Sequence, residues 1–274
     1  MSGAALGLAL AAAAIHALWN VLVGGAREPR PAVAIAMVAG VLVGAPVAVA
    51  TWHVESAAIP WIAASALLEL VYVVVLAAAY ERASVAVVYP IARGAAAPMV
   101  LAAAVATGAA TTAGQLSGVA LVAAGVLLVR GAGVATLRRG DLLLALSVAA
   151  TIAGYTLVDK QGLAYASPVA YLEAVMAGPA LAYVLFVGRR MGAAALRSAV
   201  GRGSLLAGVG MFAAYALVLA ALQRAPAAPV AAVRESSIVM APLFAAALFH
   251  HRIGCRGLAG AAAVAAGVAL VALA

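Results

Sequence analysis

The chain has 274 residues, of which 68% are hydrophobic and only 9% are charged. A soluble globular domain has about 45–50% apolar and about 25% charged residues, so this composition excludes a water-soluble fold. The net charge of +8 does not indicate a nucleic-acid partner, because the basic residues form short clusters between apolar runs, as they do at the cytoplasmic face of a bilayer.

Ten apolar runs follow one another along the chain. Each is close to the roughly 20 residues that a helix needs to cross a bilayer, and a barrel strand would need only about 9–11 residues of alternating polarity. We therefore expect an all-α membrane protein with about ten transmembrane helices. The candidate spans are 2–24, 32–52, 58–80, 83–106, 112–130, 141–161, 168–188, 203–223, 225–249 and 255–273.

The first and last runs raise two smaller points. The first 26 residues hold no lysine or arginine, so the opening run lacks the charged start of a secretory signal and is expected to remain as a span. The single cysteine, Cys255, cannot form an intrachain disulfide and is interpreted as a small apolar residue near a helix start.

Similar short sequence segments occur in the same order in the two halves of the chain. Residues 79–83 (AYERA) are echoed by 221–225 (ALQRA), and residues 118–126 (GVALVAAGV) by 260–268 (GAAAVAAGV). The pattern predicts two five-helix units, 1–130 and 135–274. Because five is odd, the second unit would enter the bilayer from the opposite side, as in the inverted repeats from which many secondary transporters are built.

Several motifs resemble those of EamA-type proteins in the drug/metabolite transporter superfamily. They are His16-Ala17-Leu18-Trp19-Asn20 in the first span, the tight turn at 80–84, a proline late in spans 4 and 9 (Pro98, Pro242), and the glycine-rich closing spans. Segments 89–94 and 234–238 also resemble members associated with phosphonate utilisation. The chain departs from the usual family pattern after span 4, where 106–111 is uncharged instead of acidic.

This resemblance implies a ten-helix carrier of small polar metabolites, in the bacterial cytoplasmic (inner) membrane, as a monomer or homodimer. It also implies a small-molecule substrate and the lipid bilayer as partners. Without a nucleotide site, transport would use an ion gradient or the gradient of the substrate itself, and protons are the candidate coupling ion. No cofactor, metal or nucleic acid is expected, and no nucleotide-binding loop, nucleophile motif or metal-ligand motif indicates an enzyme.

Charged residues inside the apolar runs are the candidate site. A charge in the bilayer centre costs a few kcal/mol on insertion scales (about 2.5–3.5 kcal/mol), so such residues should face the protein interior and find partners. Arg93 and Arg234 occupy comparable places in the two halves, and the planar guanidinium fork suits carboxylate, phosphate or phosphonate groups. The predicted substrate-binding residues are Arg93, Arg234, Glu69, Glu235, Tyr89, His16, Asn20, Tyr155 and Ser237.

Proton coupling is predicted for Glu69, Glu173, Glu235 or His16, because burial changes how carboxylates and imidazole hold protons. Thr151, Tyr155 and Asp159 share one face of the sixth span and form a candidate polar lining. Asp159 and Lys160 are close to the end of this span, where we expect them to extend to the membrane interface.

The leading hypothesis is a secondary transporter of a small anionic or zwitterionic metabolite, with proton-coupled export as one form. The alternatives are a carrier of lipid-linked or drug-like cargo on the same fold, or a membrane scaffold without transport activity. Two buried arginines disfavour a cationic drug, and an inverted repeat disfavours a scaffold.

The arginine distribution predicts the orientation. Basic residues near span ends stay in the cytoplasm, so the odd-numbered loops should be cytoplasmic and both termini external, whereas ten-helix relatives usually keep both termini inside. The even-numbered loops hold only Arg224 and, at a span edge, Lys160. The odd-numbered loops hold Arg27, Arg30, Arg82, Arg130, Arg138, Arg139, Arg189, Arg190, Arg197, Arg202, Arg252 and Arg256.

Overall fold

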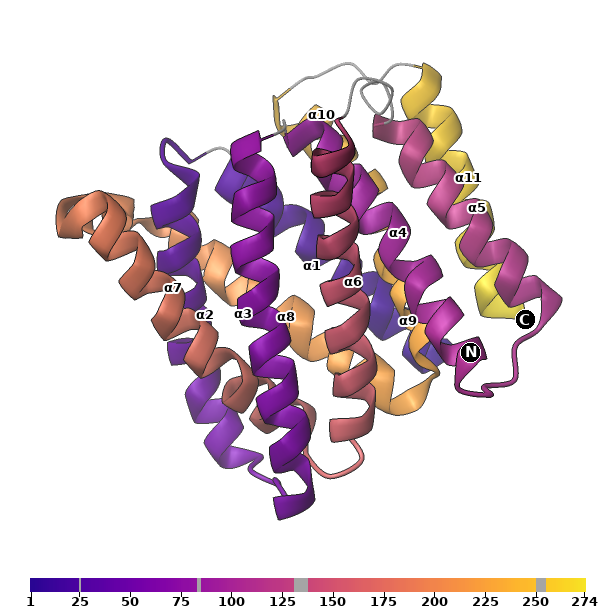
Figure 1. Cartoon of the computed structure of the whole chain (residues 1–274), viewed down its shortest axis with the longest axis horizontal. Coiled ribbons are helices and arrows are strands. Elements are labelled where there is room, and N and C mark those ends of the chain that lie inside the picture. The colour runs from indigo at the N-terminus through magenta and orange to yellow at the C-terminus, as the bar shows by residue number, and fades with distance from the viewer. Residues whose placement is uncertain (25, 83–84, 131–137, 250–254) are drawn as a thin grey trace.

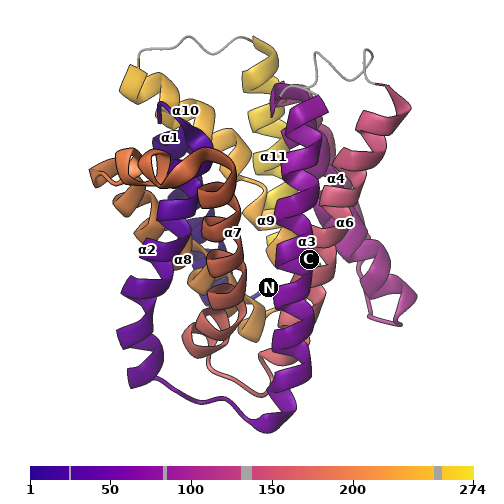
Figure 2. The same ribbon diagram turned by 60° about the vertical axis from the view of Figure 1, so that its left-hand side comes forward.

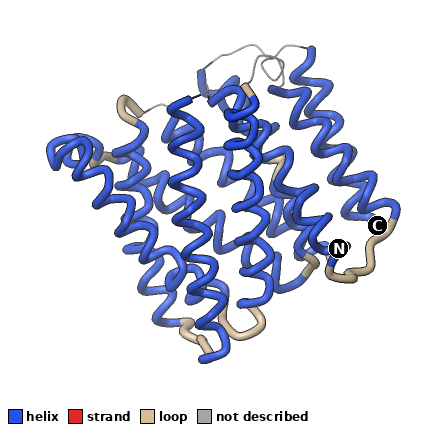
Figure 3. Tube along the Cα trace, viewed as in Figure 1, coloured by secondary structure: helices blue, strands red, loops and turns tan. Residues whose placement is uncertain are grey.

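The computed structural model describes residues 1–24, 26–82, 85–130, 138–249 and 255–274. Helices and short connections account for these residues (Figure 3). The helices are α1 (Gly3–Gly24), α2 (Pro29–Ala50), η1 (Ser56–Ala58), α3 (Ile59–Arg82), α4 (Val85–Ala106), α5 (Ala113–Arg130), α6 (Arg139–Gly162), α7 (Pro168–Ala199), α8 (Arg202–Arg224), α9 (Ala227–Arg234), α10 (Ser237–Phe249) and α11 (Cys255–Leu273).

The all-α membrane fold predicted from the sequence is confirmed. Within the described ranges, seven helices are long and apolar enough to cross a membrane, and two shorter apolar helices lie at Ile91–Ala106 and Ala113–Leu128. Large apolar side chains such as Leu42, Val49 and Leu67 are more than half exposed, as expected of a surface that faces lipid.

One predicted span and one predicted connection differ from the structure. Span 9 is divided into α9 and α10 by a turn at Glu235 and Ser236. The predicted connection 188–202 is mostly helical, because α7 continues to Ala199 across a kink at Gly192, whose φ of 84° favours glycine. The end of α7 bends away from the bundle on the left of Figure 1.

The helices of the first half pack mainly on those of the second half. α1 lies against α8, α3 against α6, α2 against α7, and α5 against α11. The α5–α11 pair forms one edge of the molecule, and α9 lies near its centre (Figures 1 and 2). All eight residues of α9 are buried, so this helix is surrounded by protein on every side.

The two ends of the chain are adjacent, because the Met1 amine donates to the Ala272 carbonyl oxygen at 3.4 Å. On the same side, the connection after α2 pairs with the connection after α6. Val54 and Ala166 form an isolated antiparallel bridge, Glu55 N donates to Tyr165 O at 2.9 Å, and Ser167 N donates to His53 O at 2.8 Å. This pairing covers the end of α6.

Candidate functional site

Four consecutive polar residues lie in the centre of the molecule where α9 meets α10. Arg234, Glu235, Ser236 and Ser237 are 7%, 1%, 7% and 1% exposed. The backbone tightens here, since Glu235 N bonds to Ala232 O and Ser236 N to Val233 O, three residues back instead of four. Successive helical residues point about 100° apart, so this turn presents polar groups in several directions at once.

Arg93 of α4 contacts several of the polar residues in one part of this centre. Its Nε lies 3.3 Å from Glu235 Oε2, and both side chains are almost fully buried. Its Nη2 lies 3.4 Å from Ser237 Oγ and 3.4 Å from His16 Nε2 on α1. Residues from α1, α4, and the α9–α10 turn therefore meet at one guanidinium.

Arg234 points toward a group of tyrosines. Its Nη2 donates to the Tyr155 hydroxyl at 3.0 Å, and its guanidinium carbon lies 5.8 Å from the centre of that ring. The Tyr155 ring in turn contacts Tyr72 and Tyr215, each with ring centres 6.1 Å apart. The two arginines thus have different environments: Arg93 contacts a carboxylate, and Arg234 an aromatic face and a hydroxyl.

Asp159 corrects the sequence interpretation. Its side chain is 0% exposed and does not extend to the interface. It accepts hydrogen bonds from Ser65 Oγ at 2.6 Å, the Tyr215 hydroxyl at 2.7 Å and the Tyr171 hydroxyl at 3.2 Å. α3, α7 and α8 cover it, whereas the neighbouring Lys160 is partly buried and donates from Nζ to the Leu222 carbonyl at the end of α8.

Glu69 of α3 lies between the two parts of the centre. It is 6% exposed and interacts electrostatically with Asp159 and Arg234, and the Tyr215 hydroxyl is also a hydrogen-bond partner of its carboxyl group. Ser65 and Glu69 are four residues apart and therefore share one face of α3. The polar groups thus form a chain from His16 on α1 to Tyr171 on α7.

Two predicted site residues, Asn20 and Glu173, stand apart from this chain, and the side chain of a third is not among the described ones. Asn20 Nδ2 donates to the carbonyl oxygen of His16 in its own helix at 2.7 Å. Glu173 of α7 is partly buried, and its Oε2 has no hydrogen-bond partner among the described residues. Tyr89 belongs to α4, but its side chain lies outside the described residues.

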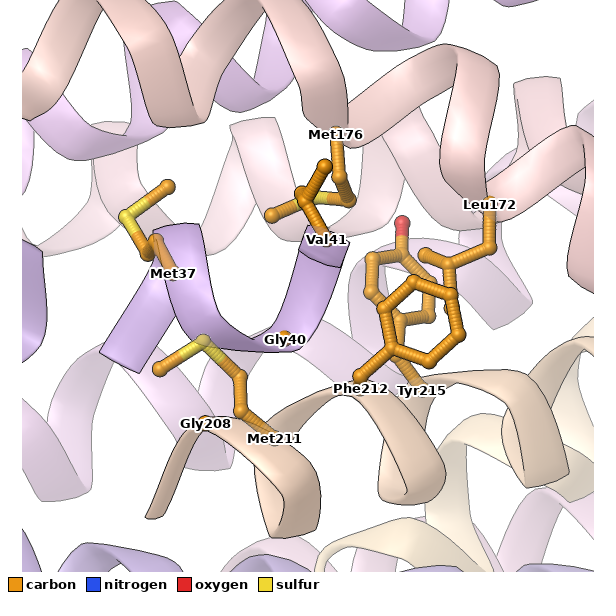
Figure 4. A pocket seen from close by; sticks show the side chains of 9 residues that line it. All are labelled: Met37, Gly40, Val41, Leu172, Met176, Gly208, Met211, Phe212 and Tyr215. Atoms are coloured by element: carbon orange, nitrogen blue, oxygen red, sulfur yellow. The ribbon is translucent and has the colours of Figure 1, made fainter. Parts of the chain in front are cut away.

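A small pocket lies between α2, α7 and α8 (Figure 4). Methionines and other apolar side chains form most of its wall, and neither arginine contributes to it. Tyr215, which also hydrogen-bonds Asp159, connects the pocket to the polar centre. The lining residues are Met37, Gly40, Val41, Leu172, Met176, Gly208, Met211, Phe212 and Tyr215.

The sequence analysis did not single out the hydroxyls around Asp159. Ser65, Tyr171 and Tyr215 lie on three different helices, and no spacing within one helix relates them. The available signal was Asp159 itself, an aspartate on the same helical face as Thr151 and Tyr155. Among the described residues, no group of three or more His, Cys, Asp or Glu side chains is placed to hold a metal ion.

Apolar helices of membrane-spanning length, packed around a buried charged centre, define a multi-pass membrane protein. Residues 139–273 match the EamA-like transporter family. A solved crystal structure with 15% sequence identity has the same fold, with a TM-score of 0.77 over 100% of this chain and 99% of that one. The second half of the chain is therefore similar to EamA-like transporters, and the whole chain has the fold of that crystal structure. No curated protein matches its sequence.

Proposed function

We propose that this protein is a secondary transporter of a small anionic or zwitterionic metabolite, that it resides in the bacterial cytoplasmic (inner) membrane, and that it performs no enzymatic reaction. The observation that carries the proposal is the pair of buried arginines, one from each half of the chain, at the end of α9 and in α4. A buried guanidinium is always charged, so it requires anionic or polar partners, either from the protein or from a ligand.

In this proposal the anionic group of the substrate replaces the protein's own ligands of Arg93. The ion pair of Arg93 with Glu235 holds the site when it is empty, and Ser237 supplies a further oxygen. A carboxylate, phosphate or phosphonate could bind the guanidinium fork through two oxygens, which a single serine hydroxyl cannot do. Glu235, once released, is available to an amine of a zwitterion.

The two-unit plan is part of the same proposal. Units 1–130 and 135–274 would be related by a two-fold axis in the membrane plane. In this plan α1, α2, α3 and α5 correspond to α6, α7, α8 and α11. The packing supports it, because the α1–α8 contact then corresponds to the α6–α3 contact, and the α2–α7 and α5–α11 contacts each join corresponding helices. Arg93 and Arg234 would then approach the centre from opposite sides.

A transport screen in reconstituted vesicles tests the function. Purified protein would be offered labelled amino acids, small carboxylates, phosphonates and phosphate esters, with cationic amines as the contrasting class. We expect counterflow of an anionic or zwitterionic compound and none of a purely cationic one. Transport of cations alone would contradict the proposal.

The variant Arg93→Lys tests the role of the guanidinium. Lysine keeps the positive charge but loses the planar fork, so we expect transport to fall by about tenfold or more, as for the loss of a charged hydrogen bond. Expression and the elution profile should not change. Arg202→Lys, an exposed residue at the start of α8, is the matched control and should transport normally. Normal transport by Arg93→Lys would show that two-point binding at this residue is wrong.

A further inference from the structure

The surroundings of Asp159 are unusual for a buried carboxylate. Its hydrogen-bond partners are three hydroxyl groups, from Ser65 on α3, Tyr171 on α7 and Tyr215 on α8. A charge buried only for structural purposes is normally paired with an opposite charge, because the desolvation cost is otherwise large. Hydroxyls differ from arginine or lysine in that they both donate and accept.

Two of these hydroxyls have a second possible partner. Tyr171 lies 3.2 Å from Asp159 Oδ1 and 3.3 Å from the Trp61 carbonyl oxygen. Tyr215 lies 2.7 Å from Asp159 Oδ2 and is also a partner of the Glu69 carboxyl group. Each hydroxyl has one hydrogen, so it can donate to only one of its two partners at a time.

This geometry accommodates Asp159 in either protonation state. When Asp159 is ionised, Ser65, Tyr171 and Tyr215 donate to it. When it is protonated on Oδ2, its single hydrogen goes to the Tyr215 oxygen while Tyr215 donates to Glu69, and Tyr171 can turn its hydrogen to the Trp61 carbonyl. Every polar group keeps a partner in both states, which is the condition for a buried carboxyl to exchange a proton at low cost.

We propose that Asp159 and Glu69 form a proton-binding site, linked by the Tyr215 hydroxyl, that couples proton movement to the transport described above. The inference rests on the proposed transport function and names the residues that carry the ion. In the elementary step, Glu69 gives its proton to the Tyr215 oxygen while Tyr215 gives its own to Asp159 Oδ2. One proton leaves Glu69, one arrives on Asp159, and Tyr215 is unchanged.

The groups that face this site connect it to the arginines. Tyr155 lies on the same helix as Asp159, Arg93 of α4 interacts with Tyr155, and Arg234 of α9 interacts with both Asp159 and Glu69. An anion bound at Arg234 would offset the positive charge that favours the ionised carboxyls. Anion binding therefore favours proton binding, and by linkage the proton favours the anion.

Tyr215 also provides the route to the site. It forms part of the wall of the pocket between α2, α7 and α8, so one side of its ring borders open space (Figure 4). Its hydroxyl reaches the otherwise enclosed Asp159. A proton that enters from the pocket would meet Tyr215 before either carboxyl group.

Infrared spectroscopy tests the proposal without any substrate. Difference spectra of the purified protein in lipid, between mildly acidic and alkaline buffers, should show the carbonyl band of a protonated, buried carboxylic acid, shifted in D₂O. Asp159→Asn should lose the part of this band that belongs to Asp159, and only the part from Glu69 should remain. Glu55→Gln is the matched control, because it removes a carboxyl group whose side chain is 53% exposed, and it should retain the band.

Tyr215→Phe and Tyr171→Phe keep the proposal testable if Asp159→Asn does not fold. Each retains the carboxyl group and removes one hydroxyl, so the band should remain but change in frequency. A band that is unchanged in both tyrosine variants, or no Asp159-dependent band at any pH at which the protein is folded, would overturn the proposal. Asp159 would then be a permanently ionised structural group, and anion transport would be unaffected by that result.

A transport measurement separates this proposal from the proposed function. With a compound from the vesicle screen, Asp159→Asn should retain counterflow but lose accumulation driven by a pH gradient. The wild type should take up the anion together with protons. If Asp159→Asn retained both counterflow and normal accumulation driven by the pH gradient, the proposed transport function would stand and the proposed proton site would be wrong.

Discussion

At the scale of single residues, each deep charge of the described site has a partner on another helix. Arg93 meets Glu235 and Ser237, Arg234 meets Tyr155, and Asp159 meets Tyr215. A charged side chain in a membrane protein is tolerated when it faces the bundle interior and is paired there. In the proposed function a substrate displaces the charged and polar partners of Arg93, whereas the Tyr155 hydroxyl keeps its contact with Arg234.

Tyr155→Phe tests that positioning role. The variant keeps the ring under the guanidinium but removes the hydroxyl 3.0 Å from Arg234 Nη2. We expect the apparent affinity for the transported anion to fall by about tenfold, as for loss of a hydrogen bond to a charged group, with a smaller effect on maximal rate. Concentration-dependent uptake measures both quantities. An unchanged affinity would show that Tyr155 does not orient Arg234.

At the scale of helices, glycines bring particular pairs into close contact. A Cβ atom at Gly118 would lie 2.8 Å from the Gly267 carbonyl oxygen, and one at Gly267 would lie 2.7 Å from the Gly118 carbonyl oxygen. The same applies to Gly125 against Gly260, at 2.8 Å. Membrane helices lack a hydrophobic driving force between them, so such close backbone approach contributes much of the packing energy.

Gly118→Val should therefore destabilise the α5–α11 pair. The added side chain would overlap the Gly267 carbonyl and Val271, and overpacking of this kind costs about 1–3 kcal/mol. Thermal unfolding in detergent, followed by size-exclusion chromatography, should show a lower transition temperature. Gly178→Val on α7, where nothing lies within 4 Å of the added Cβ, is the control. Equal stability of the two variants would contradict the close contact.

The α9–α10 turn is the second feature at this scale. Helices are commonly interrupted by proline or glycine, but the residues of this turn are Glu235 and Ser236. The Ser236 hydroxyl donates to the Val233 carbonyl oxygen at 2.7 Å. Local hydrogen bonds of this kind compete with regular helix geometry. The turn therefore results from polar side chains that bond locally and to other helices.

At the scale of the whole molecule, the adjacent termini support an even number of crossings. The end of α5 and the start of α6 lie at the opposite end of the bundle from both termini (Figure 1). Arginines lie in or beside the connections that follow α1, α3, α5 and α7, and alternation of helix direction places these connections on that same face.

A C-terminal reporter tests the orientation predicted from these arginines. A phosphatase that is active only in the periplasm, fused after Ala274, should be active, and a fluorescent protein that folds only in the cytoplasm should be dark. The same two reporters fused after Arg224, which lies on the same side as the termini, should give the same result as the fusions after Ala274. A fluorescent C-terminal fusion with inactive phosphatase would show that the termini are inside, as in ten-helix relatives.

Separating the halves tests how they depend on each other. Because α1 packs on α8 and α3 on α6, neither 1–130 nor 135–274 can bury its main packing surfaces alone. We expect each half to be degraded when expressed singly and to accumulate as a complex when both are co-expressed. Quantitative immunoblots of membranes measure this outcome. A stable half expressed alone would contradict an interdependent bundle.

The sequence by itself determined the membrane class, the all-α fold and most helix boundaries, because about 20 apolar residues can satisfy their backbone in lipid only as a helix. It also identified Arg93, Arg234 and Glu235 as deep charges, since few charges occur in such runs. Only the tertiary structure decided that Asp159 is enclosed and not at the interface. That outcome depends on Ser65, Tyr171 and Tyr215 converging from three helices and on the paired connections over the end of α6. Such contacts join residues far apart in the chain, and no local pattern along one helix encodes them.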